Sequence, residues 1–177
     1  MTKQLPQQDA LFDVQGPDEE VGYRVPIACQ VAGISYRQLD YWARTKLVQP
    51  SIRGAHGSGS QRLYSFRDIL VLKIVKGLLD TGISLQNIRK AVEKLDSLGV
   101  DDLSGITLVS DGVSVYECRS PEEVIDLLNG GQGVFGIAIP GLMKELTGTI
   151  TAFPAEKVDQ DPAIDELAER RRRRRMA

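Results

Sequence analysis

One short segment, residues 31–42 with the sequence VAGISYRQLDYW, constrains the fold of this chain more than any other. Gly33 follows residues that suit a short helix, and glycine tolerates the backbone that a tight turn between two helices requires. Ser35 stands at the N-cap position of a following helix, and Gln38, three residues later, completes the pattern of a capping box. The sequence therefore predicts a short helix, a glycine turn and a second helix.

The first turn of the predicted second helix carries Tyr36, Arg37 and Gln38, whose side chains can reach phosphates or base edges. In helix-turn-helix motifs the N-terminal residues of the second helix face the major groove of DNA. We therefore expect these three residues to contact DNA. Tyr41 either contacts a phosphate through its hydroxyl or packs, whereas Trp42, three residues after Leu39, is expected in the core.

A predicted wing follows the two helices. Residues 51–60, SIRGAHGSGS, are rich in glycine and serine, and residues 61–64, QRLY, return as a short extended run. This pattern indicates a small hairpin with a flexible tip. Arg53 and Arg62 flank the hairpin, so we expect one of them to contact phosphate. His56 at the tip either reaches the minor groove or is simply exposed.

Two further helices are predicted after the wing. Ser65 caps the first of them with Asp68 at the box position, and its apolar residues have helical spacing until Gly82 ends it. Ser84 caps the next helix. Its apolar stripe consists of Leu85, Ile88, Val92 and Leu95.

Taken together, residues 23–98 resemble the winged-helix DNA-binding domain of MerR-family transcription regulators of the short actinobacterial type. The resemblance rests on residues at matching spacing: Ala32, Gly33, Ile34, Ser35, Arg37, Leu39, Tyr41, Leu47, Pro50, Arg62, Tyr64, Ser65, Asp68, Gly82 and Ile88. It implies a cytoplasmic regulator that binds an inverted repeat in double-stranded DNA as a homodimer, with RNA polymerase at the promoter as a candidate partner. Arg62 matches the family's wing arginine and is therefore favoured over Arg53. Tyr64 also matches, with phosphate contact or packing as its role.

Two positions depart from the family pattern. Family members often carry a basic residue where this chain has Asp40, and a tyrosine where it has Trp42. A carboxylate at position 40 would repel phosphate. Asp40 either pairs with a nearby arginine or accepts a hydrogen bond from a cytosine amino group. The half-site of a relative therefore cannot be transferred to this chain.

Charge is divided unevenly along the chain, although the net charge is only −2. Residues 23–98 hold twelve Lys or Arg against five Asp or Glu, whereas residues 99–169 hold three against fourteen. The segment with the helix-turn-helix pattern is thus the basic one, as DNA binding requires. The acidic remainder raises a second possibility, an adaptor whose C-terminal domain binds a protein while DNA binding is secondary.

Residues 99–155 are predicted to form a small α+β domain for dimerisation or effector binding. Residues 106–116 indicate a hairpin about Asp111-Gly112, Ser120-Pro121 opens a helix that ends at Gly130-Gly131, and residues 134–139 and 149–153 are strand-like. Periodicity leaves residues 142–146 open between helix and strand. Gly99 precludes the long dimerising helix of many relatives. The dimer surface is therefore either the stripe at 85–95 or, as we favour, the C-terminal residues Val134, Phe135, Ile137 and Ile139; alternatively, both sets are core of one chain.

The two ends of the chain are predicted to be disordered. Residues 1–22 are acidic and resemble no signal peptide, and no apolar run approaches the length of a membrane span. Residues 156–177 are charged and end in an arginine block, which is either solvated or attracted to DNA phosphate without sequence preference.

The sequence lacks the motifs that would indicate a metal sensor or an enzyme. Cys29 and Cys118 are distant from each other and give no disulfide framework, and a metal sensor needs several ligands brought together, so neither a metal nor another cofactor is expected. There is no glycine-rich phosphate loop, no nucleophile elbow and no catalytic carboxylate pair, and the single histidine lies in a flexible loop. The sequence thus predicts a DNA-binding protein and not an enzyme.

Overall fold

The computed structural model describes residues 20–55, 61–131 and 135–157. Its elements in chain order are β1 (Val21–Arg24), α1 (Val25–Ala32), α2 (Tyr36–Arg44), β2 (Leu63–Tyr64), α3 (Phe66–Asp80), α4 (Leu85–Asp96), α5 (Val100–Leu103), β3 (Thr107–Ser110), β4 (Val115–Cys118), α6 (Pro121–Asn129), β5 (Phe135–Ala138), α7 (Ile139–Ile150) and β6 (Glu156–Lys157). A helical region with the helix-turn-helix order is followed by a small α+β region. The predicted fold class is confirmed.

Local capping fixes the helix-turn-helix as the sequence predicts. Gly33 ends α1 in the left-handed conformation, with φ 71°, and the next amide, of Ile34, donates to the carbonyl of Cys29 at 3.0 Å. The Ser35 hydroxyl accepts from the backbone N–H of Gln38, and the Gln38 side chain accepts from the backbone N–H of Ser35. These reciprocal bonds satisfy amides that the first turn of α2 would otherwise leave unpaired.

A three-stranded sheet of order β2-β1-β6 joins the two ends of the described chain. Tyr23 pairs with Tyr64, and on the other edge Gly22 pairs with Glu156. Gly22 suits this position because an ideal Cβ there would lie 2.8 Å from the Cβ of Leu63. The predicted limits of the disordered ends are therefore wrong for residues 21–22 and 156–157, since strand pairing orders them. Residues 1–19 and 158–177 lie outside the described residues.

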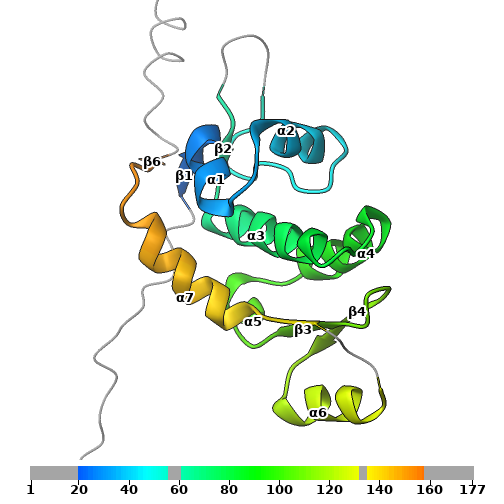
Figure 1. The fold of residues 1–177 in the computed structure, drawn as a ribbon. Helices are drawn as coiled ribbons and strands as arrows, with labels where there is room; N and C mark the ends of the chain where they lie inside the picture. The colour runs from blue at the N-terminus through cyan, green and yellow to red at the C-terminus, as the bar shows by residue number, and fades with distance from the viewer. Residues whose placement is uncertain (1–19, 56–60, 132–134, 158–177) are drawn as a thin grey trace, which may run out of the picture.

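Helix α3 lies at the centre of the molecule, with α1 and α2 on one side and α7 and β3 on the other (Figure 1). Leu70 and Ile74 lie on one side of this helix and Leu72 lies on the opposite side, yet all three are completely buried. A helix that is apolar on several faces must be covered on several faces. The C-terminal region supplies part of that cover.

The second sheet has the order β4-β3-β5, and it packs with α7 into the same core as the winged helix. Ile137 of β5 lies so close to α3 that an ideal Cβ on Gly77 would be 3.0 Å from its Cδ1 atom. Ile137 and Ile139 are 8% and 0% exposed. The alternative that these residues are core of one chain therefore holds for both of them, while Val134 lies outside the described residues. Ile88, Val92 and Leu95 of α4 are also buried, so they too are core residues of the single chain.

One strand prediction in this region is wrong. Thr149 and Ile150 end helix α7, and the residues after them form a turn and an irregular segment. The β-branched residues suggested a strand, but Leu142, Leu146 and Ile150 recur every four residues and place one apolar stripe on the core. The same spacing resolves residues 142–146 as helix. The predicted hairpin at β3–β4 and the helix α6 are confirmed.

Candidate nucleic-acid interface

Helix α2 divides sharply into a buried and an exposed face. Leu39 and Trp42 are 0% and 2% exposed, which confirms the prediction that Trp42 is a core residue. On the opposite face Tyr36 and Tyr41 are 64% and 52% exposed, and Arg37 is exposed beside them. Within the described residues, no hydrogen bond or ion pair occupies the Arg37 guanidinium. This face can therefore meet a ligand without any rearrangement of the helix.

Contacts from α4 and from the end of α2 itself hold this helix in place. Arg89 of α4 donates from Nη1 to the carbonyl of Thr45 at 2.9 Å, which satisfies a carbonyl at the end of α2. Lys46 then takes the left-handed conformation, with φ 58°, and the amide of Leu47 donates back to Trp42 at 2.9 Å. The orientation of α2 is thus fixed by the body of the protein.

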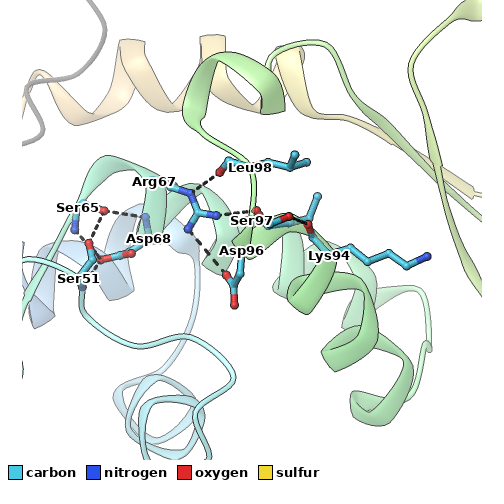
Figure 2. A network of polar contacts seen from close by, with 9 residues as sticks. Ser51, Ser65, Arg67, Asp68, Lys94, Asp96, Ser97 and Leu98 are labelled. Atoms are coloured by element: carbon cyan, nitrogen blue, oxygen red, sulfur yellow. Dashed lines mark hydrogen bonds and ion pairs between the residues drawn. The ribbon is translucent and has the colours of Figure 1, made fainter.

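The wing is anchored at its base. The backbones of Arg53 and Leu63 exchange two hydrogen bonds, of 3.2 and 2.9 Å, and β2 continues into the sheet beside β1. Figure 2 shows Asp68 of α3 beside Ser51 and Ser65, the residues on either side of the wing. Its Oδ2 atom accepts from the amide and hydroxyl of Ser51, at 2.7 and 2.8 Å, and from the amide of Ser65 at 2.9 Å. The predicted tip, with His56, lies outside the described residues.

Arg67, next to Asp68 in α3, anchors the end of α4 through side-chain hydrogen bonds. Its guanidinium donates to the carbonyls of Leu95 and Leu98, at 2.7 and 3.1 Å, and lies 3.8 Å from the carboxylate of Asp96 (Figure 2). The start of α3 therefore ties together the wing entrance and the end of α4. The side chains of both residues are engaged in contacts within the protein, through which they support the wing entrance and the end of α4.

Open clefts flank the wing on both sides. The first, of about 350 Å³, lies between the starts of α1 and α2 and the wing and is lined by Arg24, Val25, Pro26, Tyr36, Ala55, Gln61 and Arg62. The second, of about 340 Å³, lies toward the end of α2 and includes Arg44, Gly54 and again Arg62. The wing and α2 thus form one grooved surface that carries several arginines.

Arg62 is not a free wing arginine in this structure. Its Nη1 donates to Oδ1 of Asp40 at 3.0 Å, and Arg44 pairs with the other oxygen of the same carboxylate. The hydrogen bond from Arg62 holds the pKa of Asp40 below its ordinary value. Of the two roles considered for Asp40, the structure shows the pairing with arginine. The ion pair links the wing directly to α2.

The remaining predicted contact residues occupy different surroundings. Tyr64 is 0% exposed, its hydroxyl has no hydrogen-bond partner within the described part of the chain, and burial raises its pKa to about 12. Of the two roles expected for Tyr64, phosphate contact or packing, the structure therefore shows packing. Gln38 is half-buried with its amide oxygen engaged in the cap, and Arg53 is half-buried at the wing base.

Sequence reasoning missed the contribution of β1 to the cleft. Arg24 lines the cleft and pairs with Glu156 of β6, and Gln61 lies opposite on the wing. Gln61 could have been noticed as the neighbour of Arg62, but Arg24 reaches the cleft only through strand pairing between β1 and β2, which no local pattern reveals.

Other kinds of site receive no support from the described ranges. No group of three or more His, Cys, Asp or Glu side chains there is arranged to hold a metal ion. Burial raises the pKa of Cys29 and, as its largest cause, also that of Cys118, which keeps both thiols protonated and poorly reactive. Among these residues no helix is both long and apolar enough to cross a membrane.

Comparison with known proteins agrees with this geometry. A family model described as "MerR HTH family regulatory protein" matches residues 23–95, which include α1, α2, the wing, α3 and most of α4. The chain is 67% identical over 174 residues to proteins described as uncharacterized HTH-type transcriptional regulators of Mycobacterium bovis and Mycobacterium tuberculosis, with 96% of this chain and 77% of each relative covered. A crystal structure of a MerR-family transcriptional regulator from Bacillus cereus is similar with a TM-score of 0.38 at 17% identity, covering 83% of this chain and 75% of that one.

Proposed function

The chain belongs to the MerR family of helix-turn-helix transcription regulators, and from this premise we propose that it binds an inverted-repeat operator in double-stranded DNA as a homodimer. The observation that carries the proposal is the exposed face of α2 beside the grooved wing. In this arrangement α2 enters the major groove and the wing lies along the adjacent backbone.

We assign sequence recognition to Arg37 and positioning on the DNA to the cleft. Arg37 is exposed in the first turn of α2, where an arginine can make a bidentate contact to the O6 and N7 atoms of guanine. Tyr36 and Tyr41 flank it with exposed rings and hydroxyls. Arg24 and Gln61 line the cleft that would receive a phosphate strand, and such contacts fix orientation without reading sequence.

We infer homodimerisation from the size of the binding surface. A single winged helix covers one half-site, and operator affinity in such proteins comes from two half-sites whose centres lie about one helical turn, roughly 34 Å, apart. We further propose that the protein acts in the cytoplasm and that RNA polymerase at the promoter is a partner. The Asp40–Arg62 pair supports an operator different from those of relatives that carry a basic residue at position 40.

The test is selection of duplex DNA by the full chain, followed by titration of Arg37→Ala. The variant should lose about 1–3 kcal/mol of binding free energy on the selected duplex and much less on a scrambled one. Lys144→Ala, which removes an exposed cation from α7, is the matched control and should bind both duplexes as the wild type does. Equal losses on both duplexes would make Arg37 a phosphate contact. Failure to enrich any sequence would favour the alternative, an adaptor whose acidic C-terminal region binds a protein.

A further inference from the structure

Helix α6 has an outward face that nothing in the described chain covers. None of its residues is buried, and Ile125 and Leu128 are 53% and 54% exposed. The half-buried Val124 and Leu127 continue the same apolar stripe, since Val124 and Leu128 are four residues apart, and the helix packs on β4. Figure 1 shows α6 at the edge of the molecule, away from α1 and α2. Only part of the apolar stripe of α6 is therefore covered, and the part that holds Ile125 and Leu128 is left exposed.

These exposed side chains stand out in the described part of the protein. The large apolar residues with the greatest exposure there are Tyr36 and Tyr41 on the proposed DNA face, and Val113, Ile125 and Leu128 in the C-terminal region. Val113, at the tip of the β3–β4 hairpin, is 66% exposed. The proposed DNA face accounts for the tyrosines, whereas the proposed DNA contacts do not involve the other three.

The outward face of α6 is acidic as well as apolar. Glu122 and Asp126 are exposed four residues apart and thus lie on one side of the helix, next to Ile125. Neither carboxylate has a hydrogen-bond or ion-pair partner among the described residues. A partner for this face should offer apolar surface flanked by cations.

A groove of that character lies on the same chain, between α4 and the β3–β4 hairpin. It has a volume of about 210 Å³ and is lined by Asn87, Lys90, Ala91, Lys94, Ser114 and Val115. The side chain of Asn87 donates to the carbonyl of Val113 at 2.6 Å and so fixes the hairpin tip against α4. Lys90 and Lys94 are exposed one turn apart, and neither ammonium group is paired within the described ranges. Figure 2 shows Lys94 extended away from the polar network at the start of α3.

We propose that α6 of one protomer docks in the α4–hairpin groove of a second copy of this chain, and that the second copy reciprocates. Two-fold symmetry makes such a contact self-complementary, because each protomer supplies one helix and one groove. Glu122 and Asp126 then face Lys90 and Lys94 of the other protomer, and Ile125 and Leu128 are covered beside Val113. Direct pairing of two α6 helices would instead bring like charges together, which costs free energy. The inference rests on the homodimer of the proposed function and names its surface.

The test is a charge-reversal cycle on the full chain, with the dimer dissociation constant measured by sedimentation equilibrium. Glu122→Lys with Asp126→Lys, and separately Lys90→Glu with Lys94→Glu, should each raise that constant by about tenfold or more, since each creates like-charge contacts at both symmetric sites. The protein with all four reversals should return to within about threefold of the wild type, because the ion pairs are restored with exchanged signs. Lys144→Glu with Asp101→Lys, which reverses exposed charges elsewhere, is the matched control and should leave the constant unchanged.

The possible outcomes separate this inference from the homodimer itself. A wild-type protein that is monomeric at every concentration tested would overturn the homodimer and this surface with it. A wild-type dimer whose constant none of the reversals changes would overturn the surface alone. So would reversals that weaken the dimer without recovery in the fourfold variant, which would indicate a different partner for α6. Ile125→Ser with Leu128→Ser gives an independent check: both residues are exposed in the single chain, so the variant should fold and yet dimerise more weakly.

Discussion

Replacing Asp68 with alanine should loosen the wing and destabilise the whole protein. Asp68 is 5% exposed, and its Oδ2 atom accepts three hydrogen bonds, from the amide and hydroxyl of Ser51 and from the amide of Ser65. The last of these is half of the capping box of α3. Asp68→Ala therefore removes one half of the N-terminal cap of the central helix and the tether of the wing entrance in one step.

The size of the effect follows from these contacts. Hydrogen bonds to charged groups contribute about 1.5–3 kcal/mol each, but bonds that share one acceptor are not additive, and a helix cap alone contributes about 1 kcal/mol. We expect Asp68→Ala to lower the free energy of unfolding by about 3 kcal/mol, a large part of the roughly 5–15 kcal/mol typical of a domain. Asp68→Asn keeps an acceptor oxygen but loses the charge, so it should cost about 1 kcal/mol.

Urea unfolding of the full chain, followed by far-ultraviolet circular dichroism, measures both values. The transition midpoints should fall in the order wild type, Asp68→Asn, Asp68→Ala, with unchanged slope. Asp101→Ala, at an exposed carboxylate of α5, is the control and should stay within about 0.5 kcal/mol of the wild type. Asp68→Ala should also bind the selected duplex more weakly because its wing is untethered. If alanine and asparagine proved equal to the wild type in stability, the role assigned to this carboxylate would be refuted.

Three further predictions concern the wing, the core and the C-terminal region. Arg62→Ala should weaken binding to all duplexes alike and reduce the salt slope by about one unit; an unchanged slope would mean that Arg62 stays on Asp40 and does not contact phosphate. Because burial raises the pKa of Tyr64 from 10.0 to about 12, the stability that its neutral phenol contributes is complete below pH 10.0 and is lost as the pH rises through about 12. Tyr64→Phe should lack this alkaline loss in thermal melts, and a wild-type melting temperature that follows the variant's over that range would contradict the assignment. A fragment of residues 1–98 should not fold alone, since it exposes the side of α3 that packs on Ile137; a cooperative melting transition of the fragment would contradict this.

Local sequence patterns are sufficient to specify the helix starts and turns of the DNA-binding region. Gly33, the Ser35–Gln38 box and the Ser65–Asp68 box all act within three or four residues, so the chain specifies each helix start and the turn without distant contacts. The same holds for the β3–β4 hairpin at Asp111-Gly112, where Asp111 accepts from the amides of Val113 and Ser114. The exposed face of α2 followed from helical periodicity alone.

Features that depend on residues far apart in the chain could not be predicted from local patterns. The pairing of β1 with both β2 and β6, which brings Arg24 into the cleft, joins segments more than a hundred residues apart and has no local signature. The choice of Asp40 between DNA and Arg62 depended on where the wing folds back. The burial of Ile137 and Ile139 was settled by α3, which is apolar on several faces and needs cover that the winged helix alone does not provide. Helical periodicity shows that a face is apolar, but it does not show which other element covers that face. Because burial of apolar surface is non-directional, any apolar face of the chain could provide the cover, and the tertiary fold selects one.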